Sequence, residues 1–189
     1  MTSSDHQPIR ARSEDLPAKP VHIVVMGVSG SGKSTLAQAL SSALRLPMAE
    51  ADEFHPPENI SKMSAQIPLT DQDRWPWLNA LRDWMTAQRE TGSVITCSAL
   101  RRTYRDVLRA ARGDVVFLHV DVAVPRLAAR LQHRSGHFMP PALLDSQLAA
   151  LEPLEPDERG VLLTNDADET DLIAAAQSWL GVERERNHP

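Results

Sequence analysis

One short segment near the start of the chain has the residue types and spacing that bind phosphate. The run from Gly27 to Ser34 fits the pattern Gly-x-x-x-x-Gly-Lys-Ser/Thr and lies between an apolar segment and a stretch with helical spacing. Its glycines let the backbone curl so that successive N–H groups point at one anion. Lys33 would reach the β- and γ-phosphates, and the Ser34 hydroxyl would bind Mg²⁺. A glycine-rich turn that merely opens a helix is the alternative. The pattern in this context favours a nucleoside triphosphate site made of Gly27, Val28, Ser29, Gly30, Ser31, Gly32, Lys33, Ser34 and Thr35.

Charged residues also gather at the ends of two predicted strands and at the start of the longest predicted helix, which indicates a second substrate beside the phosphates. Glu50 and Asp52 are two apart on an expected strand and would point the same way. One could hold Mg²⁺ through water while the other accepts a proton from a substrate hydroxyl. Lys62 and Arg74 suit an acidic substrate. Any one such charge is more often a cap or a solvated side chain, so the coincidence of the clusters carries the argument. The clusters are Glu50 to His55, Asp71 to Arg74 and Cys97 to Arg102.

A basic stripe follows later in the chain. Arg126, Arg130 and Arg134 recur every four residues, so they share one helix face. Like charges at this spacing repel one another unless an anion meets them. For Arg126 a solvated charge is the favoured interpretation, whereas Arg130 and Arg134 are predicted to clamp the transferring phosphoryl group. His133 and His137 have the spacing of zinc ligands, but the Glu of such a motif is missing, and no zinc site is predicted.

The phosphate loop alone does not name a reaction, because GTPases, ATPases and kinases all use it. A GTPase would carry an Asn-Lys-x-Asp signature, and the lysine is missing beside Asn165 and Asp166. An ATPase would end an apolar strand in Asp-Glu, but Val122 follows Asp121. Asp121 is therefore interpreted as an ordinary residue at the end of a strand. A small kinase remains, in which a second substrate replaces water as the phosphoryl acceptor.

Strands and helices are expected to alternate along the chain. Short apolar runs predict the strands, helical spacing of apolar residues predicts the helices, and residues 56–68 are expected to be irregular. Thr70 or Asp71 is the expected cap of the longest helix. This order predicts an α/β protein with a parallel sheet covered on both faces. The predicted strands are 21–26, 48–52, 93–97, 115–120 and 160–164, and the predicted helices are 35–46, 71–89, 104–112, 125–133, 141–151 and 170–180.

Length, charge and composition narrow the class of protein. The 189 residues fit one domain, expected over residues 21–181, after a flexible tail at 1–20 and before a frayed end at 182–189. A net charge of -5 argues against binding to nucleic acid. We find no apolar run of roughly 20 residues that would cross a membrane and no secretory signal, so a cytoplasmic location is expected. Cys97 is the one cysteine, which excludes an intramolecular disulfide.

With these residues in place, the chain resembles the gluconokinases of the small P-loop type, which are related in fold to shikimate and adenylate kinases. The resemblance extends over about residues 21–181. One departure is Gln66, where the family often has glycine, so the path of that loop is open. The phosphate loop is common to many families, whereas the other segments are more specific. The segments that carry the resemblance are Gly27–Thr35, Asp52–Pro56, Asn59–Met63, Pro68–Leu78, Cys97–Arg105, Gly136–Pro140 and Leu144–Gln147.

The resemblance implies ATP-dependent transfer of a phosphoryl group to the 6-hydroxyl of D-gluconate, which gives 6-phosphogluconate. It also implies a P-loop NTPase three-layer sandwich with a five-stranded parallel sheet, a small helical lid at about residues 126–140, and a homodimer. ATP and Mg²⁺ would be the cofactors, with Ser34 and Glu50 as metal ligands. The catalytic candidates are Lys33, Asp52, Arg130 and Arg134, with Asp52 accepting or orienting the proton of the 6-hydroxyl. The substrate-binding candidates are Asp52, His55, Lys62, Arg74, Ser98, Arg105 and His137, although Ser98 could simply shape the backbone.

Two other interpretations stay open. The chain could be a kinase for another small acid or for a nucleoside monophosphate. It could also be an ATP-sensing module without transfer activity, against which the intact Lys33, Ser34 and Asp52 argue.

Overall fold

The computed structural model describes residues 20–132, 141–165 and 169–181. The predicted terminal segments, apart from Pro20, and residues 133–140 of the predicted lid therefore lie outside the described residues. The predicted alternation of strands and helices is confirmed, with boundaries that shift by a few residues. In chain order the elements are β1 (Val21–Met26), α1 (Lys33–Leu44), β2 (Met48–Glu50), the 3₁₀ helix η1 (Ala51–Phe54), α2 (Pro57–Ser64), α3 (Asp71–Ala87), β3 (Ser93–Thr96), α4 (Arg102–Arg109), β4 (Asp114–Asp121), α5 (Val124–Gln132), α6 (Pro141–Ala150), β5 (Gly160–Thr164) and α7 (Glu169–Trp179).

Two short helices lie in segments for which the sequence predicted other structure. The stretch expected to be irregular contains α2, which begins at Pro57. Proline has no backbone N–H, but at the first position of a helix that N–H would have no partner within the helix. This helix buries only Asn59, so its apolar periodicity is too weak to reveal it. The second difference is η1. The strand β2 ends at Glu50, and Asp52 lies in η1, so the prediction that both carboxylates share one extended strand is wrong.

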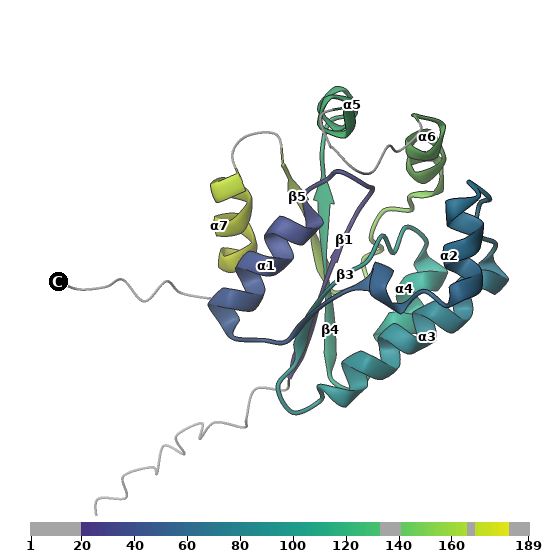
Figure 1. The fold of residues 1–189 in the computed structure, drawn as a ribbon. Coiled ribbons are helices and arrows are strands. Elements are labelled where there is room, and N and C mark those ends of the chain that lie inside the picture. Colours follow the sequence, from purple (N-terminus) through teal and green to yellow (C-terminus); the bar gives the residue numbers. More distant parts are fainter. Residues whose placement is uncertain (1–19, 133–140, 166–168, 182–189) are drawn as a thin grey trace, which may run out of the picture.

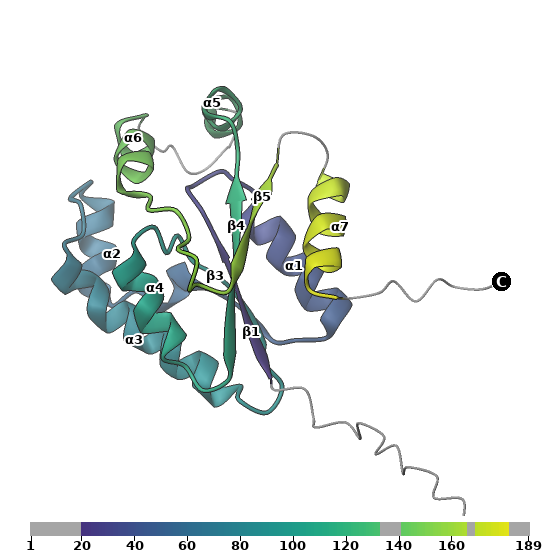
Figure 2. The same ribbon diagram turned by 180° about the vertical axis from the view of Figure 1, so that it is seen from behind.

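The strands form one five-stranded parallel sheet in the order β2-β3-β1-β4-β5. Helices α1 and α7 cover one face, and α2, α3 and α4 lie on the other (Figures 1 and 2). Parallel strands need crossover connections, which place helices over both faces of the sheet. The predicted three-layer α/β architecture is confirmed.

The central strand β1 supplies both layers of the core. Ile23 and Val25 pack with the residues beneath α1 and α7, whereas Val24 and Met26 pack with those beneath α3 and α4. Each of these four side chains is at most 2% exposed. Because successive side chains of a strand point to opposite faces, a continuous apolar run is what a doubly covered strand requires. The run also fixes the position at which the chain leaves the sheet.

The carboxyl edge of the sheet is where the charged clusters meet. The chain leaves β1 into α1 on one face of the sheet and leaves its neighbour β3 into α4 on the other face (Figures 1 and 2). Ligands of open α/β sheets bind in the crevice at such a point. Helices α5 and α6 lie beyond this edge in both views (Figures 1 and 2).

The long helix α3 begins with a capping box. The Thr70 side chain accepts a hydrogen bond from the Asp73 N–H, and the Asp73 side chain accepts one from the Thr70 N–H. This arrangement satisfies two backbone donors that a helix start leaves unpaired. The buried residues of α3 are Trp77, Leu78, Leu81 and Met85, and the expected cap at Thr70 is confirmed. The cap thus fixes the first turn of α3, which carries Asp71, Asp73 and Arg74.

A buried histidine pins β1 to its neighbours. The Nε2–H of His22 donates to the Arg112 carbonyl at 2.8 Å, and its Nδ1 therefore accepts from the Ser93 hydroxyl at 2.8 Å. Burial lowers the pKa of His22, and the hydrogen bond to Arg112 opposes that effect only in part. The ring is neutral in the folded protein at pH 7.

None of the helices described is long and apolar enough to span a bilayer.

Stability is expected to fall between pH 6.5 and 5, in part because of His22. Well above pH 6.5 the ring is neutral in both states. Below that value the unfolded chain binds a proton that the folded protein does not, so the free energy of unfolding decreases as pH falls. One bound proton changes the free energy of unfolding by at most about 1.4 kcal/mol per pH unit. Denaturant unfolding at pH 7, 6 and 5 should show a smaller decrease for His22→Gln than for the wild type. Equal pH dependence in the two proteins would contradict this assignment.

Candidate active site

The phosphate loop leaves β1 through a close backbone approach. The φ of Gly27 is 137°, and a Cβ at this position would lie 2.6 Å from the Val120 carbonyl oxygen. Its N–H donates to the Ser98 carbonyl oxygen at 3.3 Å. Only glycine fits such a site, because a side chain would collide with β4. The start of the loop is therefore fixed against both strands that flank β1.

Lys33 at the other end of the loop folds back on it. Its ammonium donates to the Val28 carbonyl oxygen at 2.9 Å. Nearby, burial raises the pKa of Cys97 to about 12, with the Asp52 charge adding to the shift and Lys33 opposing it. Asp52 and Lys33 thus both lie within electrostatic range of the Cys97 thiol. The phosphate loop and the predicted acceptor residue therefore share one edge of the sheet.

Residues from β5 and α5 meet the middle of the loop. Asn165, which follows β5, donates through Nδ2 to the Ser31 carbonyl oxygen at 2.9 Å. Arg130 lies beside both, 3.4 Å from that carbonyl and 3.5 Å from the Asn165 Oδ1. The structure thus brings Arg130 to the loop. Arg134 and His137 lie outside the described residues, and Arg126 is half-buried.

On the acceptor side, η1 presents Asp52 to solvent beside His55. The Trp77 indole N–H donates to the Ala51 carbonyl oxygen at 2.7 Å, and the His55 ring stacks on Trp77 at a centroid distance of 4.3 Å. Burial lowers the pKa of His55 most strongly; the Asp52 charge opposes this shift, and the Arg74 charge adds to it. Asp52, His55 and Arg74 are therefore neighbours, as expected for one binding site.

The tautomer of His55 is set by its surroundings. The Asn59 amide donates to the His55 Nδ1 at 3.3 Å and to the Asp73 carbonyl oxygen at 2.8 Å. Because Nδ1 accepts, the neutral ring carries its proton on Nε2. His55 can thus offer an N–H to a substrate hydroxyl.

Lys62 belongs to the same region but has a protein partner. Its ammonium lies 2.7 Å from the Asp73 carboxylate. Hydrogen bonds from Lys62 and Thr70 lower the pKa of Asp73 to about 2. The lysine charge is held in place by an acid that stays ionised throughout the neutral range.

Arg74 is one of two guanidinium groups around Tyr104. Arg74 and Arg101 lie 5.5 and 5.9 Å from the centre of the Tyr104 ring. The Asp71 carboxylate accepts a hydrogen bond from the Tyr104 hydroxyl at 2.6 Å, and it lies 3.2 Å from Arg101 and 3.6 Å from Arg74. One carboxylate thus bridges two guanidinium groups, a geometry that an acidic substrate could adopt.

Glu50 and Ser98 take more local roles. The Glu50 carboxylate at the end of β2 accepts a hydrogen bond from the Thr96 hydroxyl of β3. Ser98 supplies its carbonyl to Gly27, so it does shape the backbone.

Arg105 is a correction to the sequence prediction. It has no exposed surface, and its guanidinium makes a two-pronged ion pair with Glu158, at 2.6 and 2.8 Å. It also donates to the carbonyl oxygens of Ala99, Leu100, Glu152 and Pro153. Burial is the strongest single influence on the pKa of Glu158 and would raise it, but the hydrogen bonds from Arg105 and from the Glu155 N–H, together with the charges of Arg105 and Arg102, lower it. Arg105 has no donor to spare for a substrate, and it anchors the segment after α6 to α4.

Sequence reasoning missed Tyr104, Asn165 and Gln147 as site residues, and it named Arg101 only as part of the cluster from Cys97 to Arg102. Gln147 of α6 accepts the Ser29 N–H at 2.8 Å. Arg101 and Gln147 stand in segments that carry the family resemblance, which is the signal that could have pointed to them. Nothing in the local pattern of Asn165 distinguishes it from an ordinary residue after a strand.

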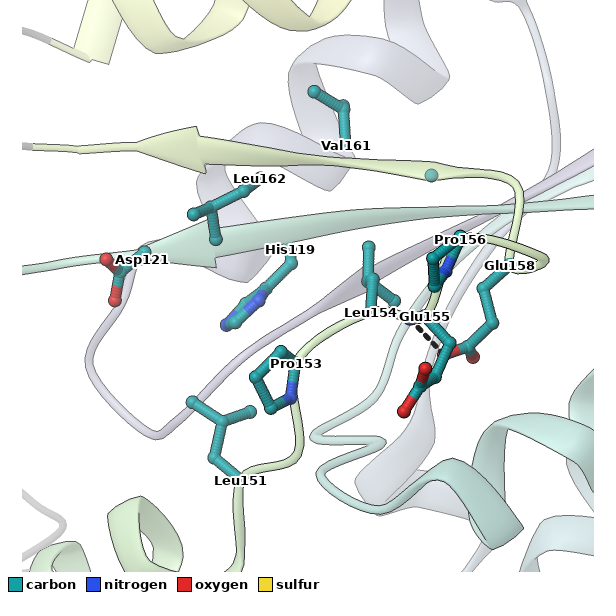
Figure 3. A pocket seen from close by; sticks show the side chains of 11 residues that line it. His119, Asp121, Leu151, Pro153, Leu154, Glu155, Pro156, Glu158, Val161 and Leu162 are labelled. Carbon is teal, nitrogen blue, oxygen red and sulfur yellow. Dashed lines mark hydrogen bonds between the residues drawn. The ribbon is translucent and has the colours of Figure 1, made fainter.

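A cavity of about 540 Å³ lies away from these residues, between β4, β5 and the segment after α6. Figure 3 shows His119 pointing toward Pro153 and Leu162. Burial lowers the pKa of His119 most strongly, opposed by Asp121 and assisted by Arg105. No predicted catalytic or binding residue lines this cavity.

Known proteins resemble this chain over most of its length. Residues 29–170 match the family model for shikimate kinase. A gluconokinase of Gluconobacter oxydans is 51% identical over 142 residues, which make up 74% of this chain and 80% of the relative. A solved sugar kinase from Janibacter sp. HTCC2649 superposes with a TM-score of 0.82 at 52% identity, covering 86% of this chain and 95% of that one. A solved gluconokinase from Sinorhizobium meliloti 1021 gives a TM-score of 0.76 at 46% identity, covering 87% and 93%.

The buried pair of Arg105 and Glu158 predicts a large cost for removing one charge. Glu158→Gln leaves the Arg105 guanidinium uncompensated, so the free energy of unfolding should fall by about 3 kcal/mol or more. Glu155→Gln is the matched control, because it makes the same change at an exposed position of the same segment. It should stay within about 0.5 kcal/mol of the wild type. Denaturant unfolding measures both, and similar losses in the two variants would contradict the structural role of Arg105.

Proposed function

The chain belongs to the gluconokinase family, and from this premise we propose that it transfers the γ-phosphoryl group of ATP to the 6-hydroxyl of D-gluconate, giving 6-phosphogluconate and ADP. The observation that carries the proposal is the 51% identity to the gluconokinase of Gluconobacter oxydans over 80% of that protein. The residues at the carboxyl edge of the sheet support it, because they combine a phosphate loop with an acid, a neutral histidine and two arginines.

ATP would bind along the phosphate loop and the start of α1. The N-terminus of α1 and the loop amides attract the phosphate oxygens. Lys33 would exchange the Val28 carbonyl for the β- and γ-phosphates, since a charged partner makes the stronger hydrogen bond. Arg130, held beside the loop by Ser31 and Asn165, is suited to stabilise charge on the γ-phosphoryl oxygens. Arg134 stays a prediction for the same role.

The side-chain oxygen atoms at this edge of the sheet are suitable ligands for Mg²⁺. It prefers oxygen ligands, keeps several waters and takes one or two protein groups beside the phosphates. Ser34 is exposed at the start of α1, and Glu50 ends β2, so both offer oxygen atoms. Among the residues that the structure describes, no group of three or more acidic, histidine or cysteine side chains forms a complete metal cage, which agrees with a metal shared with the nucleotide. When bound, the ion would neutralise charge on the β- and γ-phosphates.

Asp52 is proposed to activate the acceptor. Its exposed carboxylate stands next to His55 and within range of Lys33. The 6-hydroxyl oxygen of gluconate forms the new bond to the γ-phosphorus, the bond to the β–γ bridging oxygen breaks, and the hydroxyl proton passes to Asp52. ADP leaves with the electron pair of the broken bond.

The remaining groups are proposed to hold gluconate. Arg74 would bind the carboxylate, with Arg101 as a second guanidinium group near the Tyr104 ring. His55 would donate its Nε2–H to a sugar hydroxyl, and Lys62 would supply a third positive charge. For His137 the predicted contact rests on the family resemblance alone. The same resemblance supports a homodimer. A cytoplasmic location without membrane binding stays the expectation from the lack of a long apolar run and of a secretory signal, and the net charge of -5 argues against nucleic acid as a partner.

The direct test is ADP release from ATP and Mg²⁺ with and without gluconate. We expect release that depends on gluconate and is at least tenfold slower with other sugar acids or with nucleoside monophosphates. If another acceptor gave equal or faster ADP release, that acceptor would be the substrate in place of gluconate. ATP binding without ADP release on any acceptor would favour the sensing module.

Replacing the proposed base should affect turnover more than nucleotide binding. Asp52→Asn keeps the size of the side chain but removes the proton acceptor, so kcat should fall at least about 100-fold while ATP affinity stays within about threefold. Glu53→Gln is the matched control, because Glu53 is an exposed acid next to it in η1. Steady-state kinetics and ATP titration separate the two effects. An Asp52→Asn protein with the turnover of Glu53→Gln would eliminate Asp52 as the base.

A further inference from the structure

The middle of the phosphate loop is held by two side chains from distant parts of the chain. Gln147 of α6 accepts the Ser29 N–H through Oε1 at 2.8 Å and donates through Nε2 to the Ser29 hydroxyl at 3.3 Å. Asn165 holds the Ser31 carbonyl. The two contacts fall on either side of Gly30, whose φ is 80°. The flexible centre of the loop is thus fixed from both sides, while β1 and α1 hold its ends.

The contact with Gln147 fixes the direction of one particular residue. A primary amide that engages both the backbone N–H and the side-chain hydroxyl of Ser29 leaves that residue little rotational freedom. The Ser29 N–H is taken by Gln147, and the loop N–H groups that follow Ser29 are the ones left to face an anion. The orientation of Ser29 is therefore set by α6, an element more than a hundred residues away in sequence.

Helix α6 is also packed against the loop. Leu144 of α6 and Val28 of the loop are buried in one cluster with Leu127 of α5, and Leu148 packs against that cluster. Gln147 thus lies on a helix turn whose neighbours are already in contact with the residue before Ser29. Any displacement of α6 is transmitted to Ser29 through an apolar contact and two hydrogen bonds.

We propose that Gln147 is a positioning residue for phosphoryl transfer, which acts through Ser29 by setting the first half of the phosphate loop relative to the γ-phosphoryl group. The inference rests on the proposed kinase function. The expected effect of losing the Gln147 contact is a lower kcat with unchanged ATP affinity, because Lys33 and the loop amides after Ser29 still bind the nucleotide. Small misplacements of reacting groups cost up to about 100-fold in rate.

The test compares Gln147→Met with Asp145→Ala. Methionine has nearly the length of glutamine but makes neither hydrogen bond, and Asp145 is an exposed residue of the same helix. We expect kcat for ADP release with gluconate to fall about 10- to 100-fold in Gln147→Met, with the KM for ATP within about threefold of the wild type. Asp145→Ala should match the wild type in both.

A second measurement needs no substrate. Amide hydrogen exchange of Ser29 in the ligand-free protein should be at least about tenfold faster in Gln147→Met than in the wild type or Asp145→Ala, because the N–H loses its acceptor. Unchanged exchange would overturn the contact itself.

The outcomes separate the two proposals. An active wild type with unaltered kcat in Gln147→Met contradicts the role of Gln147 alone, even if that variant melts at a lower temperature. A wild type that releases no ADP in response to gluconate contradicts the proposed function, whatever the exchange rates are.

Discussion

The close approach of the Gly27 backbone to the Val120 carbonyl is the constraint on which the site depends. It brings the phosphate loop out of the sheet between two flanking strands, and the hydrogen bond to the Ser98 carbonyl ties the same residue to the segment after β3. Because β1 is buried on both faces, this exit point cannot move without disturbing two apolar layers. The loop, the end of β3 and the end of β4 are thereby placed at one edge. Groups that bind phosphate and groups that bind the acceptor come within reach of each other for that reason.

The acceptor side is held by charges that already have partners. Asp73 pairs with Lys62, and Asp71 bridges Arg74 and Arg101 through an arrangement that includes the Tyr104 hydroxyl. Exposed ion pairs of this kind contribute little to stability, but they restrict where long basic side chains can go. An acidic substrate therefore meets guanidinium groups whose positions are already limited. The carboxylate of the proposed substrate would compete with Asp71 for them, and the displaced Asp71 side chain would exchange its guanidinium partners for water.

The sequence was sufficient for the architecture and for the phosphate loop, because strand apolarity, helical spacing and the loop pattern are local signals. It failed at α2, whose only buried residue is Asn59, and at Asp52, which lies in a 3₁₀ turn and not on the strand that alternation suggested. It failed at Arg105 because burial by a partner 53 residues away cannot be read from neighbouring residues. Gln147 and Asn165 were missed for the same reason, since each contacts the loop from more than a hundred residues away.

The one cysteine of the chain, which has no role in the proposed reaction, lies in an environment that suppresses its reactivity. Cys97 is 2% exposed beneath the edge where substrates are proposed to meet, and burial raises its thiol pKa to about 12. Thiolates, and not thiols, react with peroxides, disulfides and alkylating agents. A protonated sulfur in that position is inert toward all three. Burial and the raised pKa thus both keep the Cys97 thiol from reacting with oxidants and thiol-directed reagents.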